Sequence, residues 1–320
     1  MLRLILFALQ FFVAAGVCAQ SYPARPVRLI VAQSPGSSQD TLARFLTPKL
    51  SELLGQQVVI DNRGGAAGMM GVEMAARATP DGHTLVVGAS TAMVIARFTY
   101  RSLPFDAERD FAPISLTSNS ESVMVVHPSL PAKTARELVA IAKAKPGQLN
   151  MGSAGVGSSS HLGGVMFTAL AGIDAVHVPY KGGGPLVTAV LANESQFAMP
   201  PAASVTTQAK AGRLRAIAIS SKARSPLMPE LPTLDESGVP GYEYTSWNAI
   251  FAPRATPPAV IAKLHATLRA ALADSDVKTL YAAQGLLPAS SASPAELAAF
   301  MRADVERIAK LVKIAGIKPE

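Results

Sequence analysis

The sequence predicts an α/β protein of two lobes, each a mixed sheet flanked by helices. Three observations predict this class: short apolar runs alternate with segments of helical periodicity, Gly- and Pro-rich turns separate them, and the chain is long. Its 320 residues suffice for two domains of ordinary size. Charged residues make up only 16%, which argues against a coiled coil and against a disordered, highly charged chain.

The N-terminus has the layout of a secretory signal peptide over residues 1–19. Arg3 precedes an apolar run from Leu4 to Val17, and small residues end the segment at Ala19. The run is shorter than the roughly 20 residues that a membrane-spanning helix needs, which favours a cleavable signal over an anchor. We therefore expect export and cleavage near Ala19. Since Cys18 is the only cysteine, the mature chain should hold no disulfide and no thiolate metal site.

Strands and helices alternate from the start of the mature chain, beginning with an apolar strand at 27–32. Apolar residues at helical spacing follow it, at Leu42, Phe45, Leu46, Leu50 and Leu53. Pro48 lies inside this pattern and is expected to kink or split the helix. Strands are expected at 58–60 and 85–87, with a short helix to Ala78 between them. Runs that are apolar throughout are typical of parallel strands buried on both faces.

The middle of the chain repeats this alternation. Thr134 and Glu137 form a capping box, which predicts a helix start after a strand at 123–126. The elements expected next are strand 149–151, a helix with Leu162, Val165, Met166, Ala169 and Leu170 on one face, strand 175–178, helix 186–192, strand 197–199, helix 204–211 and strand 214–219. Such an order predicts open sheets with right-handed crossovers.

The last third is expected to differ, with Pro- and Gly-rich turns from about residue 225 that include 242–251. Helices at 258–273 and 294–315 end the chain and are expected to pack on the first lobe. We expect the chain to cross between lobes near 118–122 and again near 221–225. The predicted first lobe is therefore discontinuous, residues 20–120 plus 224–320, and the second comprises residues 121–223.

Three loops, at 33–40, 152–161 and 180–184, share one construction: a buried strand, a Gly/Ser-rich turn and a helix start. Exposed backbone N–H groups and about half a positive charge at a helix N-terminus favour a bound anion. Since ligands of open α/β sheets lie at the carboxyl ends of strands, two such loops from facing lobes can hold a small anion without a cation. The alternative is that these residues serve only as caps and turns.

Signals for other chemistry are weaker. Ser160 precedes His161, but it lacks a G-x-S-x-G context and an evident carboxylate partner, which argues against a serine hydrolase. No P-loop Lys-Ser/Thr follows the glycines, and the five histidines are dispersed, so neither a nucleotide nor a zinc site is expected. The basic residues occur singly, which argues against nucleic acid as a partner. Trp247 is expected either to line a cleft or to pack in the core.

Several motifs occur in a fixed order along almost the whole mature chain. They are Ser34-Pro35-Gly36 with Asp40, the segments 62–68 and 78–85, Gly155-Val156-Gly157-Ser158 with His161-Leu162, Val178-Pro179-Tyr180-Lys181-Gly182, and the segments 210–216 and 247–253. As an ordered set they resemble the Bug-type periplasmic solute receptors of the tripartite tricarboxylate transporter system.

This resemblance implies a type II-like, two-lobed periplasmic binding protein that closes on a small carboxylate in the cleft between its lobes. It implies a periplasmic location and transporter membrane subunits as partners, with no cofactor, no metal and no catalysis. One-to-one capture requires no more than a monomer. Carried over position by position, with Trp247 added, the expected ligand-binding residues are Gln33, Ser34, Ser37, Ser38, Gln39, Asp40, Ser90, Thr91, Gly155, Gly157, Ser158, Ser159, His161, Tyr180, Lys181 and Trp247.

Three departures from the family pattern bear on the ligand. Ser37 replaces the second glycine of the first loop, and Ala249 replaces a glycine after the Trp-Asn pair. Pro200-Pro201 follows the strand at 197–199, where the family has an aspartate near the cleft. If that aspartate meets a ligand ammonium group, its absence argues against amino-acid ligands.

The sequence thus supports one main hypothesis and two alternatives. The main hypothesis is an extracytoplasmic receptor that captures a dicarboxylate or related organic acid by backbone amides and serine hydroxyls for delivery to a transporter. The first alternative is an exported serine hydrolase that uses Ser160 or a neighbour with His161. The second is a sensor or interaction protein with a vestigial cleft.

Overall fold

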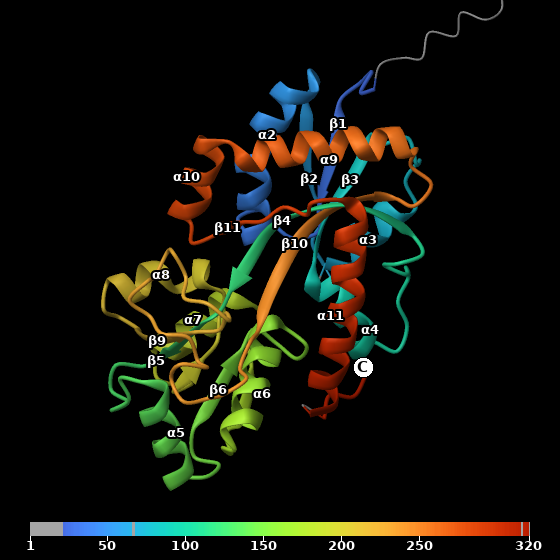
Figure 1. Ribbon diagram of the computed structural model, residues 1–320. Coiled ribbons are helices and arrows are strands. Elements are labelled where there is room, and N and C mark those ends of the chain that lie inside the picture. The colour runs from blue at the N-terminus through green and yellow to red at the C-terminus, as the bar shows by residue number, and fades with distance from the viewer. Residues whose placement is uncertain (1–21, 66–67, 315, 320) are drawn as a thin grey trace, which may run out of the picture.

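The chain forms two mixed sheets, each flanked by helices (Figure 1), in a computed structural model that describes residues 22–65, 68–314 and 316–319. The six-stranded sheet has the spatial order β11 (Leu287–Pro288), β4 (Phe111–Glu121), β10 (Thr245–Pro253), β3 (Thr84–Ala89), β1 (Val27–Val31), β2 (Val58–Asn62). The five-stranded sheet has the order β7 (Val176–Pro179), β6 (Asn150–Ser153), β8 (Phe197–Ala198), β5 (Val123–Val126), β9 (Arg215–Ile219). We call the two sheets with their helices the first and the second lobe.

The predicted fold class is confirmed, and the predicted alternation gives most of the elements. The helices of the first lobe are α2 (Ser38–Leu54), α3 (Met69–Ala76), the π-helix η2 (Thr91–Ile95), α4 (Ala96–Thr99), α9 (Pro258–Ala273), α10 (Ser275–Ala283) and α11 (Pro294–Ile314). Those of the second lobe are α5 (Ala135–Ala144), α6 (Ser159–Ala171), α7 (Gly183–Leu191) and α8 (Ala202–Lys210). The predicted signal peptide, residues 1–19, lies outside the described residues.

The first sheet separates two packed layers, because successive side chains of a strand point to opposite faces. Val27, Leu29 and Val31 of β1 are buried against α2, α9 and α10, whereas Ile30 belongs to the core beneath α3 and η2. The core that contains Ile30 continues under α11 into the second lobe, where it includes residues of α5 and α6. A third cluster packs α7 and α8 on the opposite face of the second sheet.

Several local predictions were wrong. The segment 242–251, expected as turns, contains most of β10, which pairs antiparallel with β4 and β3 in the middle of the sheet. Neither β4 nor α10 was predicted. The helix α2 runs unbroken through Pro48, since its opposite face is held in the core by buried leucines. In α6 the buried face is shifted from the predicted one: Leu162 is buried as expected, but Phe167 and Ala171 also face the core, and Leu170 is 46% exposed.

The chain passes between the lobes twice. Only Ser122 separates the end of β4 from the start of β5. On the return, Tyr244 donates its N–H to Ser220 O (2.9 Å) beside the second sheet, and β10 begins at the next residue. The structure places Met228 and Leu231 in the third cluster, beside the second sheet. The predicted lobe boundaries, 20–120 plus 224–320 and 121–223, stay a prediction.

Candidate ligand-binding cleft

A cleft of about 670 Å³ lies between the lobes. Its lining comes from the ends of β3 and β4, from β10, and from the loops that begin α2, α6, α7 and α8. The lining residues are Gln33, Gly36, Ser37, Ser38, Gln39, Ala89, Ser90, Thr91, Ser120, Ala154, Ser158, Ser159, Ser160, Gly182, Gly183, Gly184, Leu186, Val187, Pro201, Ser204, Ser246, Trp247 and Asn248. Both lobes therefore contribute to one hollow.

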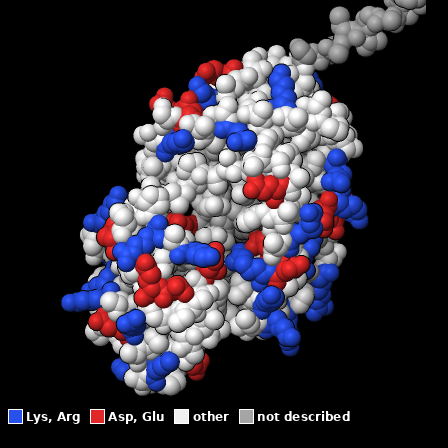
Figure 2. Space-filling view, viewed as in Figure 1, with Lys and Arg blue, Asp and Glu red and all other residues white. Residues whose placement is uncertain are grey.

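Within the part of the chain that the structure describes, no Asp, Glu, Lys, Arg or His lines this cleft. Figure 2 shows charged side chains of both signs interspersed over the face of the molecule that it presents. The polar groups that remain in the cleft are hydroxyls, amides and the N–H groups of helix starts. Because the first N–H groups of each helix lack intrahelical acceptors and carry partial positive charge, the cleft suits an anion without offering it a counter-ion.

The first-lobe loop is fixed by a cap and by a buried carboxylate. The Ser37 hydroxyl accepts a hydrogen bond from the Asp40 N–H (3.2 Å) and so begins α2. Asp40 is 2% exposed and accepts from Gly36 N (2.9 Å) and Arg44 Nε (2.8 Å). Burial alone would raise the pKa of Asp40, but hydrogen bonds from Arg44, Gly36 and Asn62 outweigh burial and hold this pKa below its ordinary value. Asp40 therefore braces the loop as a carboxylate.

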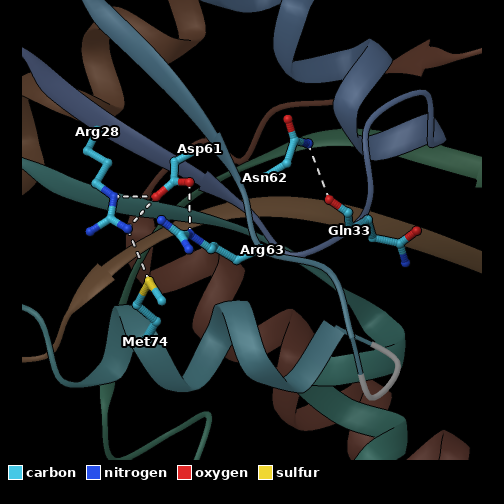
Figure 3. A network of polar contacts seen from close by, with 6 residues as sticks. All are labelled: Arg28, Gln33, Asp61, Asn62, Arg63 and Met74. Atoms are coloured by element: carbon cyan, nitrogen blue, oxygen red, sulfur yellow. Dashed lines mark hydrogen bonds and ion pairs between the residues drawn. The ribbon is translucent and has the colours of Figure 1, made fainter.

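Asn62, at the end of β2, joins this loop to the neighbouring strand. It donates to the backbone oxygen of Gln33 (3.2 Å) and to Asp40 Oδ1 (3.0 Å). Figure 3 shows the Gln33 side chain directed away from Asn62, and Arg28 and Arg63 converging on Asp61, next to Asn62. This network fixes the backbone of Gln33 and leaves its side chain for the cleft.

Behind the first loop lies a row of buried amides. Gln39 Nε2 donates to Asn248 Oδ1 (3.1 Å), and Asn248 Nδ2 donates to Ser118 Oγ (3.1 Å). The other amide atom of Gln39, Oε1, and the hydroxyl of Ser90 are buried and have no hydrogen-bond partner among the described residues. Buried polar atoms are normally paired, and because Gln39 and Ser90 line the cleft, a ligand could supply the partners of these two.

The second-lobe loop repeats the cap of the first. The Ser158 hydroxyl accepts from His161 N (3.2 Å) and donates to Gly155 O (2.7 Å). Ser160 Oγ accepts from Ala154 N (2.8 Å), and His161 Nδ1 accepts from Gly157 N (3.1 Å). These internal bonds set the loop that begins α6, whose first residues, Ser159 and Ser160, line the cleft.

Two stacked imidazoles support this loop from outside the cleft. The rings of His161 and His177 lie 3.9 Å apart at 12°, and His177 Nε2 is 2.6 Å from Ser153 Oγ. Burial, with repulsion from His177, lowers the pKa of His161 to about 4. Burial also lowers the pKa of His177. Both rings are thus neutral near pH 7, and His161 acts as an acceptor for the loop backbone.

The loop before α7 presents bare backbone to the cleft. Gly183 and Gly184 are the first residues of α7, and Pro185 follows them. A Cβ built on either glycine would meet no described atom within 4 Å. The helix N-terminus is therefore open to a ligand.

Trp247 forms the wall where the lobes meet. Its indole Nε1 donates to Asp304 Oδ2 (2.8 Å), and Asp304 also pairs with Arg307 of α11. The side chain is 1% exposed, and its hydrogen bond to Asp304 ties the indole to α11 beside the cleft.

Most of the predicted ligand-binding residues line the cleft: Gln33, Ser37, Ser38, Gln39, Ser90, Thr91, Ser158, Ser159 and Trp247. The others are placed outside its lining: Ser34, Asp40, Gly155, Gly157, His161, Tyr180 and Lys181.

Each residue outside the lining has a structural reason for its position. Asp40 and His161 are used internally, as described above. Tyr180 shares a hydrogen bond with Ser195 (3.1 Å), and the side chains of Ser34 and Lys181 are exposed on the surface. Gly155 and Gly157 have φ values of 122° and 73°, which shape the turn.

Several lining residues were not predicted, among them Ser120, Ser204, Ser246 and Asn248. Three of these lie on the strands β4 and β10, which sequence reasoning missed. Asn248 could have been predicted, because it follows Trp247 directly in the Trp-Asn pair of the segment 247–253.

The geometry also bears on the hydrolase alternative. His161 Nδ1 accepts from the Gly157 N–H and Ser160 Oγ accepts from the Ala154 N–H, and these two side chains share no hydrogen bond. No group of three or more His, Cys, Asp and Glu able to hold a metal occurs among residues 22–65, 68–314 and 316–319.

Residues 42–317 match the model of the tripartite tricarboxylate transporter family receptor. The chain belongs to this family. It is 34% identical to BugT of Bordetella pertussis, over 96% of this chain and 94% of BugT. This family membership identifies the chain as a binding protein, not an enzyme, and its receptors are periplasmic.

Solved structures of receptors have the same fold. Rpa4515 of R. palustris, solved with adipate, has a TM-score of 0.86 at 31% identity, covering 93% of this chain and 100% of that one. MatC of Rhodopseudomonas palustris, with bound malate, has a TM-score of 0.79 at 30% identity, covering 91% and 100%. In the described part of this receptor, no helix combines the length and apolarity needed to cross a membrane.

Proposed function

We propose that this receptor captures a small organic acid in the cleft between its lobes, through backbone amides and serine hydroxyls, and delivers it to a membrane transporter. The observation that carries the proposal is the cleft itself: both lobes line it with helix starts and hydroxyls, and its described lining holds no charged side chain. Adipate and malate, the ligands of the two similar structures, are carboxylates of the size we propose.

The binding energy available from these groups is sufficient. Each hydrogen bond to a charged group contributes about 1.5–3 kcal/mol net. Micromolar affinity corresponds to a net binding free energy of roughly 8 kcal/mol. The contacts must also offset the free energy that is lost when the ligand is immobilised. About half a dozen such bonds in a closed cleft meet that requirement.

The other parts of the proposal follow from the sequence and the family. The mature receptor starts after Ala19, is periplasmic and acts as a monomer, with subunits of a tripartite tricarboxylate transporter as its partners. Of the predicted ligand contacts, we propose those that line the cleft, with Gly183, Gly184 and Asn248 added.

A charge placed at the start of α7 tests the proposal. We expect Gly184→Asp to weaken carboxylate binding at least about tenfold, because the new carboxylate would face the anion in the cleft. The helix itself tolerates Asp in its first turn, and a Cβ added at Gly184 meets no described atom within 4 Å. Binding is measured by calorimetry and by fluorescence of Trp247, the single tryptophan of the chain.

Gly184→Asn is the matched control, since it has nearly the same shape without the charge. Loss of binding in the Asp variant but not in the Asn variant supports anion capture at this helix. Equal affinities in both variants would place the site elsewhere. A receptor that binds no mono-, di- or tricarboxylate would favour the sensor or interaction protein with a vestigial cleft.

A further inference from the structure

Two polar atoms in the first-lobe wall of the cleft are buried and lack partners. Gln39 is 4% exposed and Ser90 is 2% exposed, yet both line the cleft. Neither Gln39 Oε1 nor Ser90 Oγ has a hydrogen-bond partner in residues 22–65, 68–314 and 316–319. Leaving such an atom unpaired costs about 1–3 kcal/mol, so a ligand that satisfies both gains affinity over one that does not.

The strand register brings the two residues to the same part of the wall. Asn248 of β10 lies opposite Ala89 of β3, the residue before Ser90. Gln39 Nε2 donates to Asn248 Oδ1 (3.1 Å), so the amide of Gln39 is tied to the strand that pairs with the end of β3. The contact from Asn248 Nδ2 to Ser118 Oγ (3.1 Å) holds the other end of this row.

The chemistry of the two atoms specifies the ligand group. With its nitrogen donating to Asn248, Gln39 offers an acceptor, and the Ser90 hydroxyl can donate. A ligand hydroxyl that reaches both atoms would satisfy both, by donating to Gln39 Oε1 and accepting from Ser90 Oγ. An unsubstituted methylene satisfies neither, and a keto oxygen can only accept.

An ammonium group suits the site less well. It could donate to Gln39 Oε1 and to Ser90 Oγ, but it could not accept the Ser90 proton, which would stay unpaired. Its charge would also face helix N-termini in a cleft whose described lining holds no carboxylate.

We propose that the cleft selects hydroxy carboxylates, with Gln39 and Ser90 as the residues that recognise the ligand hydroxyl. The proposal rests on carboxylate capture by the same cleft and adds the substituent that distinguishes one acid from another. A site built to bond a hydroxyl rejects the analogue that lacks it more strongly than an apolar pocket does.

Matched acids test the proposal. The probes are glutarate, 2-hydroxyglutarate, 2-oxoglutarate and glutamate, together with succinate, malate, oxaloacetate and aspartate, titrated by calorimetry. We expect the hydroxy acid of at least one set to bind about tenfold or more tighter than its unsubstituted, keto and amino counterparts. Equal affinity within both sets would overturn the proposal.

Two variants assign the preference to the named side chains. Gln39→Met keeps the length of the side chain without its amide, and Ser90→Ala removes only a hydroxyl. Each should reduce the hydroxy-to-unsubstituted affinity ratio to near one, whatever its effect on the affinity common to both acids. Thr117→Val is the matched control, because Thr117 Oγ1 is a buried hydroxyl without a described partner that lies outside the cleft lining. The ratio should be unchanged in that variant.

The remaining outcomes are equally decisive. Tightest binding of a keto acid would overturn the assignment of Gln39 as an acceptor. A keto oxygen only accepts, so Gln39 would have to present its NH2 group to the ligand. The side-chain amides of both Gln39 and Asn248 would then have to be turned around. Tightest binding of glutamate or aspartate would overturn the exclusion of ammonium. Carboxylate binding without any hydroxyl preference defeats this inference alone, whereas absence of binding to every acid defeats carboxylate capture as well.

Discussion

His161 shows how one neutral ring supports the binding loop of the second lobe. Its Nδ1 accepts the N–H of Gly157, and its ring stacks on that of His177. Protonation would convert Nδ1 into a donor facing another donor. It would also place a positive charge against a second imidazole in a buried position, which is why the pKa of His161 is lowered to about 4.

We expect the free energy of unfolding to decrease as the pH falls from about 6.5 to about 4. The unfolded chain binds a proton at His161 near the ordinary pKa of 6.5, whereas the folded chain binds it only near 4. The stabilising contribution of neutral His161 to the free energy of unfolding is therefore complete above pH 6.5 and is lost progressively as the pH falls toward 4. Urea unfolding of the wild type and His161→Asn at several pH values measures this effect.

The Asn variant should show a weaker pH dependence, because its Oδ1 can accept from Gly157 N but does not titrate. Identical pH profiles in the two proteins would show that His161 is not the group responsible.

Residues whose role is set by local sequence were the easiest to predict. Ser37 and Ser158 were expected in the helix-start loops, and both cap a helix at the cleft. The same local signal could not separate His161, which turns away from the cleft, from the serines beside it. Gln39 and Asn248 are 209 positions apart, and only the folded chain shows that their amides meet.

At the scale of elements, local signals again succeeded where the element is locally specified. The capping box at Thr134 and Glu137 is present and begins α5. The strand β10 has no such signal: Ser246 and Asn248 interrupt its apolar residues because they face the cleft. Its partner β4 lies more than a hundred residues earlier, so the pairing is decided by tertiary structure.

Pro48 in α2 gives a prediction at this scale. Proline inside a helix removes one backbone hydrogen bond and disturbs the preceding turn, at about 3 kcal/mol relative to Ala. Since Pro48 is exposed, Pro48→Ala loses little packing. We expect it to raise the free energy of unfolding by about 2 kcal/mol, after the added freedom of the unfolded chain is subtracted. Urea unfolding measures the change.

Pro258→Ala serves as the control, because Pro258 is the first residue of α9, where proline is well tolerated. It should leave stability unchanged or slightly reduced. A loss of stability in Pro48→Ala would mean that packing of the proline ring stabilises the fold more than the backbone hydrogen bond that alanine restores.

At the scale of the whole molecule, the lobes touch on both sides of the cleft. Gly157 of the second lobe approaches Thr99 of α4, so that an added Cβ would lie 2.8 Å from Thr99 Cγ2. A Cβ on Gly285, near α10, would lie 3.3 Å from the backbone of Ala203 in α8. The helix α11 packs on η2 in the first lobe and on α6 in the second. Opening the cleft must therefore separate or slide these contacts.

A double-mutant cycle at the first contact tests whether ligand binding needs the lobes this close. We expect Gly157→Ala to weaken binding of the tightest acid of the panel by roughly tenfold, because its methyl group would push Thr99 away and because Gly157 has a φ of 73°. Thr99→Ser removes Cγ2, so Gly157→Ala should cost less affinity in that background, while the backbone strain is the same in both and cancels. Calorimetry gives the four affinities. If the effect of Gly157→Ala is independent of residue 99, then strain alone acts and the contact between lobes plays no part in binding.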